Sequence, residues 1–235
     1  MSPAVPVPAS TLTILRERKG IEVYLTRRNA NLVFLGGYHV FPGGRRDEDD
    51  FSEAAIKRMH AASLKLKAEQ VESREPQAQR LGYYSAAVRE AFEEAGILIA
   101  CQRGGGRIKP GRELKKELAR ERSAIHAGRI TFLQMLEQFD FAYDLDRLFW
   151  YARWVTPEFS PRRFDTQFFA AALPRGQRPA GFPEEVDDEF WVRPEDALAQ
   201  WRAGKLAMIP PTAASLATLA NFSNLKQLRK KWGKK

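Results

Sequence analysis

Apolar and polar residues alternate through residues 11–28, with a break at Lys19-Gly20. Alternation with a period of two is typical of strands that bury one face, so this stretch predicts a β-hairpin around the break. The glycine- and proline-rich residues 36–44 predict a short strand followed by a turn. Aromatic and β-branched residues dominate three later stretches that predict further strands, at 148–156, 165–173 and 187–193.

Apolar residues recur at helical spacing in several other segments. Residues 52–69 predict a helix with Ser52 as its N-cap, and residues 83–96 predict a helix that ends at Gly96 in the left-handed conformation. The polar residues 72–80 between them predict a loop. The remaining predicted helices are two within 112–139, one at 194–204 and one or two within 210–231.

Helices and strands thus interleave without strict alternation, which favours the α/β (α+β) class with a mixed sheet sandwiched between helices. The 235 residues are 44% hydrophobic and 29% charged, and they predict one domain at 11–235 after a flexible lead at 1–10. The single cysteine, Cys101, excludes an intrachain disulfide and a cysteine zinc site. With no apolar leader and no run of about 18 apolar residues, the sequence predicts a cytoplasmic protein without a membrane span.

The net charge is +9, and much of the excess lies in residues 103–122 and 225–235. Three interpretations fit this distribution: a nucleic-acid surface, a field that attracts polyanionic small molecules, or a solvated basic surface. No RNA-binding signature occurs elsewhere in the chain, and Trp232 is the only aromatic residue of the basic C-terminal segment. A nucleic-acid partner is therefore not expected.

Three glutamates share one face of the predicted helix at 83–96. Glu90, Glu93 and Glu94 stand at positions i, i+3 and i+4, where like charges cost about 0.2–0.5 kcal/mol per pair. Arg89, four residues before Glu93, offsets part of this repulsion. A divalent cation held by the three carboxylates would reverse it, because Mg²⁺ prefers hard oxygen ligands. Taken alone the cluster is more often a solvated helical face, so the metal interpretation needs a partner motif.

A partner motif lies upstream, in the segment HVFPGG and the acidic residue Asp50 that follows it. Together the two segments resemble the Nudix box, G-x5-E-x7-R-E-U-x-E-E-x-G-U, in which U is a bulky apolar residue. The second half matches from Arg89 onward, and the first half matches at Gly44, with Asp50 in place of the glutamate. However, 38 residues separate Asp50 from Arg89, where the box has seven. The box is split by a helical insertion at about 51–81, whose ends can still meet because loop-closure entropy grows only logarithmically with length.

This split arrangement resembles one branch of the Nudix hydrolase superfamily, which includes the eukaryotic peroxisomal coenzyme A diphosphatase and bacterial relatives. Segments similar to that branch continue in the same order to about residue 228. A second signature precedes the box in some coenzyme A-cleaving members. This chain is similar to it at Leu25 and Arg28 but has Val33 where the pattern has a basic residue.

The resemblance implies a Nudix fold with an accessory helical segment at about 112–139. It also implies a role for each matched residue. Metal-binding and catalytic groups would be Glu90, Glu93, Glu94 and the carbonyl oxygen of Gly43, holding Mg²⁺ or Mn²⁺. Arg89 would orient these ligands. The general base in this family is either a glutamate of the box or an acid from a distant loop, and Glu185 in the acidic run 183–189 is the candidate from such a loop. Substrate contacts would come from Arg28, Gly44, Arg162 and Arg163. A solvated turn is an equal alternative for Glu185 and for the arginine pair.

The function implied is Mg²⁺-dependent cleavage of the diphosphate in a nucleoside diphosphate linked to another moiety. Coenzyme A or acyl-CoA, cut to 3′,5′-ADP and phosphopantetheine, is the favoured substrate, and NADH, ADP-ribose and nucleotide sugars are alternatives. A Nudix module that binds a nucleotide without cleaving it is a further alternative, although the complete set of box carboxylates argues against it. Because dimers are common in the superfamily, the resemblance also allows a homodimer.

Overall fold

The alternating residues near the start of the chain form the hairpin that the sequence predicts. The computed structural model describes residues 4–233, in which β1 (Val7–Glu17) and β2 (Ile21–Arg28) pair antiparallel with Leu15 opposite Val23. They belong to a seven-stranded sheet with the order β10 (Val186–Val192), β2, β1, β9 (Phe164–Ala172), β8 (Phe149–Val155). Two short strands complete it: β3 (His39–Val40) pairs with β2, and β4 (Gly43–Arg45) pairs with β1.

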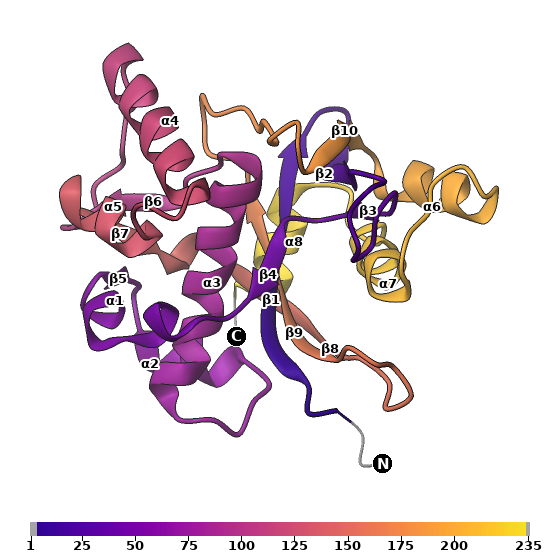
Figure 1. Cartoon of the computed structure of the whole chain (residues 1–235), viewed down its shortest axis with the longest axis horizontal. Coiled ribbons are helices and arrows are strands. Elements are labelled where there is room, and N and C mark those ends of the chain that lie inside the picture. Colours follow the sequence, from indigo (N-terminus) through magenta and orange to yellow (C-terminus); the bar gives the residue numbers. More distant parts are fainter. Residues whose placement is uncertain (1–3, 234–235) are drawn as a thin grey trace.

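The sheet is mixed, because β1 and β9 run parallel while its other strand pairs run antiparallel. Successive residues of the long strands point to opposite faces of the sheet and pack into two different hydrophobic cores. On β1, Leu12 and Ile14 pack against α3 (Gln77–Ala95) and its neighbours, whereas Leu15 packs on the opposite face. That second face is covered by α6 (Pro194–Arg202), α7 (Pro210–Leu219) and α8 (Leu225–Trp232). Figure 1 shows the sheet edge-on between these two groups of helices, as the fold class predicted.

The insertion differs in detail from the single helix expected at 52–69. It contains a 3-10 turn, η1 (Glu48–Phe51), then α1 (Glu53–Lys57) and α2 (Leu64–Gln70), with β5 (Met59–His60) between the two helices. The chain leaves the helical path because β5 pairs parallel with β7 (Phe141–Asp144). Ser52 caps α1 as predicted, since its hydroxyl accepts the N–H of Ala55 at 3.2 Å.

A second, three-stranded sheet was not predicted from the sequence. Its order is β5, β7, β6 (Ala100–Gln102), and none of these strands exceeds four residues. Strands this short show no readable periodicity, so only their pairing partners define them. In this sheet Cys101 of β6 pairs with Ala142 of β7, so the strand that follows α3 is hydrogen-bonded to the strand that follows the accessory segment 112–139.

Two predicted boundaries were wrong. The flexible lead at 1–10 does not extend that far, because β1 begins at Val7, where the strand pairs with Phe164 of β9. Residues 1–3 lie outside the described residues. The loop predicted at 72–80 ends early, because α3 begins at Gln77.

The accessory segment at 112–139 forms two helices, as predicted. They are α4 (Arg112–His126) and α5 (Phe132–Gln138), and Gly128 between them has a positive φ of 66°. In Figure 1 α4 stands up beside the end of α3, with the loop between β9 and β10 across from it. Within residues 4–233 no helix is both long and apolar enough to cross a membrane.

Candidate active site

The three glutamates lie on the last turns of α3, where each side chain is partly buried. The fully buried positions around them are small or apolar and include Ala87, Ala91 and Phe92. The helix ends at Gly96, whose φ of 66° is left-handed and whose N–H bonds to the carbonyl of Phe92 at 2.9 Å. Gly96 therefore stops the helix two residues after Glu94, as the sequence predicted.

Asp50 and Arg89 join the two halves of the split box. Nε and Nη2 of Arg89 donate to the two carboxylate oxygens of Asp50 at 3.1 and 3.0 Å. Such paired bonds fix both distance and orientation. Asp50 is only 1% exposed, and it also accepts the backbone N–H of Asp47 at 2.9 Å. The ends of the insertion thus lie close together, and Asp50 binds the arginine of the box rather than pointing toward the glutamates.

A second arginine, Arg46, links the two ends of the insertion. The two Nη atoms of Arg46 donate to the carboxylate of Glu75 at 2.9 and 2.7 Å, and Nη1 also donates to the carbonyl of Gln79 at 2.7 Å. The guanidinium lies 4.4 Å from the ring centre of Tyr83. These contacts link the residue just after β4 to the start of α3. The insertion therefore leaves and re-enters the fold at one place.

Arg89 also gathers two of the glutamates. Its Nη1 donates to Oε1 of Glu90 at 2.7 Å and to Oε2 of Glu93 at 3.2 Å. Its Nη2 donates to the carbonyl of Arg45 at 2.7 Å. Two carboxylates therefore converge on one positively charged nitrogen. The compensation expected between Arg89 and Glu93 is present, and it extends to Glu90.

Glu94 turns toward β4 and the end of β2. Its Oε2 accepts the backbone N–H of Gly43 at 2.9 Å, and its Oε1 lies 3.6 Å from Nη1 of Arg28. Nε of Arg28 donates to the carbonyl of Phe34 at 3.3 Å, which ties the loop after β2 to the same place. The structure thus brings Arg28 and Gly43 to the glutamate cluster.

Gly43 and Gly44 have no room for a side chain. A Cβ on Gly44 would lie 2.5 Å from Oε1 of Glu90, and a Cβ on Gly43 would lie 2.5 Å from the carbonyl oxygen of Ser10. The absence of a Cβ at both positions lets the backbone of β4 approach α3 and β1 closely. The backbone of β4 consequently forms one wall of the carboxylate cluster.

The environment makes these glutamates weaker acids than usual. Burial raises the pKa of Glu90 to about 8, an effect that Arg89 opposes and the neighbouring glutamates increase. Burial also raises the pKa of Glu94 to about 7, against the N–H of Gly43 and the charge of Arg28. The pKa of Glu93 is raised as well, again mainly by burial. Burial and mutual repulsion thus destabilise the ionised carboxylates. A metal cation bound in place of the protons would stabilise the ionised form.

Across residues 4–233, no group of three or more His, Cys, Asp or Glu side chains is already arranged around a common metal position. The reason is visible in the contacts: Arg89 holds Glu90 and Glu93, while Arg28 and Gly43 hold Glu94. The donor chemistry nevertheless fits a hard divalent cation, because all three side chains offer carboxylate oxygens on one helix face, beside the glycine backbone of β4. Binding would require the carboxylates to rotate away from their present partners.

Glu185 lies near the cluster but contacts α4. Its charge contributes to the raised pKa of Glu94, and its carboxylate lies 3.8 Å from Nδ1 of His126. The backbone carbonyl of Glu185 accepts the N–H of Asn29 at 2.8 Å, so the acidic run also contacts the loop that follows Arg28. The structure therefore brings Glu185 close enough to affect Glu94 electrostatically.

Arg162 and Arg163 are not brought to the glutamates. They lie in the turn between β8 and β9, where Arg163 donates to the carbonyls of Thr156 and Ala4 at 3.0 and 2.7 Å. Gln167 is the β9 residue in register with the strand pair Ser10 and Gly44, and Arg163 precedes it by four residues, roughly 13 Å along an extended strand. In this position Arg163 holds the β8–β9 turn against the start of the chain.

Arg122 is a residue of the site that the sequence did not single out. Its Nε donates to the carbonyl of Glu93 at 3.0 Å, and its guanidinium lies 4.2 Å from the ring centre of Phe182. Its Nη2 is buried without a hydrogen-bond partner among the described residues. Arg122 stands 29 positions after Glu93, so only the packing of α4 on α3 reveals their contact. In the sequence, the feature that pointed toward Arg122 was its place in the basic segment 103–122.

Comparison with known proteins places this arrangement among described families. The family model of the NUDT19 Nudix domain matches residues 4–219. Acyl-coenzyme A diphosphatase NUDT19 of Homo sapiens is 28% identical over 241 residues, which cover 90% of this chain and 64% of that protein. The Xenopus laevis protein of the same name is 26% identical over 236 residues, covering 89% of this chain and 62% of the relative. The chain thus spans somewhat less than two thirds of the length of these relatives.

Among solved structures, the NUDIX hydrolase from Alicyclobacillus acidocaldarius is similar throughout. The TM-score is 0.75 and the sequence identity 28%, and the match covers 94% of each chain. The similarity therefore includes the accessory segments as well as the central sheet.

Proposed function

The chain belongs to the NUDT19 Nudix family, and from this premise we propose that it is a diphosphohydrolase that uses a divalent metal ion to cleave coenzyme A or acyl-CoA. The family match confirms the branch that the split box indicated. The substrate class is supported by relatives that are named acyl-coenzyme A diphosphatases. One observation of the structure carries the proposal furthest: the paired bonds between Asp50 and Arg89 reassemble the interrupted box beside the glutamates.

The proposal assigns Glu90, Glu93 and Glu94 as the residues that hold Mg²⁺ or Mn²⁺, with the carbonyl of Gly43 beside them. When bound there, such a cation supplies charge that neutralises a diphosphate and makes a nearby water molecule more acidic. Arg89 orients Glu90 and Glu93, to which it already donates hydrogen bonds. Gly44 leaves space for Glu90 and for substrate to approach the backbone of β4.

In the reaction, the oxygen of a water molecule bonds to one phosphorus of the diphosphate while the bridging phosphorus–oxygen bond breaks. A carboxylate accepts the proton of that water. Glu185 is our proposed acceptor, because it comes from a separate loop and lies near enough to Glu94 to affect its pKa. Arg28 is our proposed phosphate contact, and its guanidinium beside Glu94 at the edge of the cluster supports this role. The products from coenzyme A are 3′,5′-ADP and 4′-phosphopantetheine.

A product assay tests the substrate class directly. We expect the purified protein with Mg²⁺ or Mn²⁺ to convert coenzyme A and acyl-CoA to 3′,5′-ADP and the matching phosphopantetheine, with no turnover in excess EDTA. Chromatography of the products identifies both the substrate and the bond that is cut. NADH, ADP-ribose and nucleotide sugars are the comparison substrates. Faster cleavage of one of these would replace coenzyme A in the proposal, and binding without any cleavage would favour a non-catalytic module.

The raised pKa values of the glutamates predict how the stability of the metal-free protein depends on pH. Because the pKa of Glu90 is raised to about 8 and that of Glu94 to about 7, these two groups bind more protons in the folded chain than in the unfolded chain above about pH 5. Their contribution to the free energy of unfolding is therefore greatest at low pH within this window and falls as pH rises from about 5 to 8. Thermal melts in EDTA across this range measure the slope.

A matched variant shows how much of the pH dependence of stability comes from the glutamate cluster and how much from the rest of the protein. Glu90→Gln removes one of the titrating carboxylates, so its melting temperature should fall less steeply with pH than that of the wild type. Added Mg²⁺ should raise the wild-type melting temperature more at pH 8 than at pH 5.5, because ligands must be deprotonated to bind metal. Equal slopes for wild type and variant would remove the cluster as the source of the pH dependence.

A further inference from the structure

A large groove opens at the end of α3, on the side of α4. It has a volume of about 1430 Å³ and is bordered by Gly96 at the C-terminus of α3, by residues 107–111 before α4, by α4, and by residues 172–182 after β9. Leu98, Leu118 and Phe149 contribute apolar surface to it. A groove of this size accommodates a nucleotide-sized ligand.

The charge of the groove is strongly positive. Two carboxylates line it, Asp144 and Asp146, and both have cationic partners of their own, Arg147 and Lys67. Apart from Arg122, six further cations line the groove, and none of these six makes an ion pair within the described residues: Arg107, Lys109, Lys115, Arg175, Arg178 and Arg229. Unpaired cations gathered around a concave surface focus a positive potential that attracts polyanions. The basic segment noted at 103–122 supplies part of this lining.

The loop that carries Arg175 and Arg178 is hydrogen-bonded to the end of α3 and to the segment that follows it. The side-chain amide of Gln177 donates to the carbonyl of Leu98 at 2.9 Å and accepts its N–H at 2.8 Å. The N–H of Ala180 donates to the carbonyl of Ala95 at 3.0 Å. Both partners lie within four residues of Glu94. The two arginines consequently keep a defined position relative to the glutamates.

Arg122 lies where the groove meets the glutamate cluster. It lines the groove, its Nε bonds to the carbonyl of Glu93, and Glu94 and Glu185 are close enough to affect its pKa. Gly96, which also lines the groove, follows Glu94 by two residues, an axial rise of about 3 Å. The groove therefore begins beside the place where we propose that the diphosphate is cleaved.

We infer that this groove receives the 3′-phosphate of the adenosine moiety of coenzyme A, so that its unpaired cations select substrates that carry this additional phosphate. The inference rests on the proposed function. In coenzyme A the diphosphate and the 3′-phosphate are attached to the same ribose, so a site for the second phosphate has to adjoin the site for the first. The pantetheine moiety is uncharged and offers nothing to six cations. Arginine binds phosphate through strong paired hydrogen bonds.

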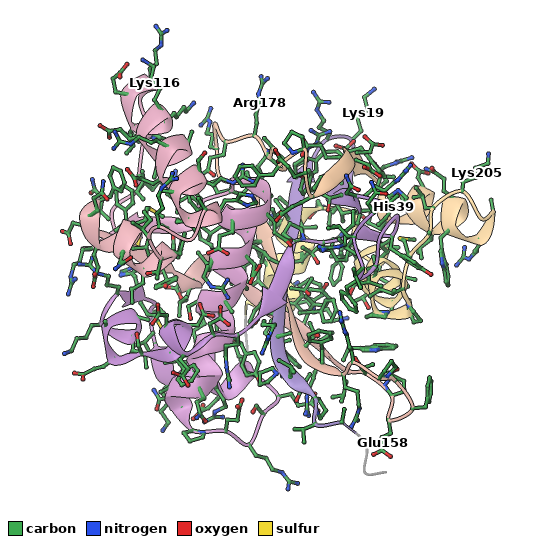
Figure 2. The ribbon with its side chains drawn as sticks, viewed as in Figure 1. Lys19, His39, Lys116, Glu158, Arg178 and Lys205 are labelled. Carbon is green, nitrogen blue, oxygen red and sulfur yellow. The ribbon has the colours of Figure 1, made fainter. Side chains whose placement is uncertain are left out.

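A substrate pair that differs only in this phosphate tests the inference. We expect kcat/KM of the wild type to be at least tenfold higher for coenzyme A than for dephospho-coenzyme A. Arg175→Ala/Arg178→Ala should lower kcat/KM for coenzyme A about tenfold, mainly by raising KM, because these contacts bind the ground state and the transition state alike. The same variant should change kcat/KM for dephospho-coenzyme A less than threefold. Figure 2 shows Arg178 extending from the loop after β9, on the side of the molecule that carries Lys116 of α4.

A charge-matched control is available at the end of α6 and in the turn after it. Arg202 and Lys205 are exposed, make no ion pair among the described residues and do not line the groove, and Figure 2 places Lys205 at the opposite side of the molecule from α4. Arg202→Ala/Lys205→Ala removes the same charge and should leave the ratio of the two kcat/KM values unchanged. The side chains changed in the two double variants make no hydrogen bond to the rest of the described chain. We therefore expect the groove variant and the control variant to have the melting temperature of the wild type.

The possible failures are distinguishable. If the wild type cleaves neither compound, the proposed function fails. If the wild type cleaves both with equal kcat/KM, or if the groove variant lowers both values equally, the inference is overturned while the proposed function stands. Binding of a single-stranded oligonucleotide, measured in parallel, tests the alternative that the groove binds nucleic acid. Its loss in the groove variant, with the ratio of kcat/KM values unchanged, would assign the groove to nucleic acid instead.

Discussion

Replacing Glu94 with glutamine is expected to lower kcat at least a thousandfold while the protein remains folded. The amide removes one of the charged ligands that we assign to the metal, and a thousandfold loss corresponds to about 4 kcal/mol of transition-state stabilisation. Folding should survive, because a glutamine oxygen can still accept the N–H of Gly43. Neutralising a carboxylate whose pKa burial already raises should leave the melting temperature of the metal-free protein equal or higher.

The measurement is turnover with saturating Mg²⁺, combined with thermal melts in EDTA. Glu93→Gln should behave in the same way, because Glu93 lies on the same helix face as Glu94 and is likewise assigned to the metal, although its arginine partner is Arg89 and not Arg28. Glu117→Gln on α4 is the matched control, since Glu117 is exposed and has no ion pair within residues 4–233. Turnover of Glu94→Gln within tenfold of the wild type would remove Glu94 from the metal site.

Replacing Asp50 with alanine is expected to lower the free energy of unfolding by about 3–5 kcal/mol, since it leaves the guanidinium of Arg89 without its buried partner. For a chain of this size the melting temperature should fall by roughly 6–20 °C. The stability of the wild type and the variant is compared by denaturant unfolding. Activity should fall as well, because Arg89 also positions Glu90 and Glu93.

The neighbouring residue provides the control for this second variant. Asp49 is exposed and its side chain makes no ion pair or hydrogen bond in the described structure, so Asp49→Ala should unfold within about 0.5 kcal/mol of the wild type. Asp50→Asn keeps the shape and some of the acceptors and should fall between the two. A loss below 1 kcal/mol for Asp50→Ala would show that the paired bonds do not hold the two halves of the box together.

Local sequence was sufficient for the main elements and for the carboxylate cluster. The hairpin at 11–28 could be predicted because alternation along a strand is a property of neighbouring residues. The end of α3 at Gly96 and the common face of Glu90, Glu93 and Glu94 follow from helix geometry alone. The family resemblance then depended on the order and spacing of these same local patterns.

The short strands and the true course of the insertion could not be predicted in this way. A helix was expected through residues 52–69, but β5 interrupts it because a partner strand, β7, is supplied from about 80 residues later in the chain. The start of β1 at Val7 likewise depends on pairing with Phe164. In both cases hydrogen bonds to a distant strand outweighed local preference, which is a weak determinant of structure.

The assembly of the site was decided by the tertiary structure. The sequence contained both halves of the box and predicted an insertion between them, and the paired bonds from Arg89 to buried Asp50 show how the two halves are held together. The contact of Arg122 with Glu93, and the groove that begins beside it, depend on the packing of α4 against α3. The types and spacing of the residues determined which chemistry the chain can carry. Their position in space depended on contacts between residues far apart in sequence, because burial and ion pairing act between neighbours in the fold.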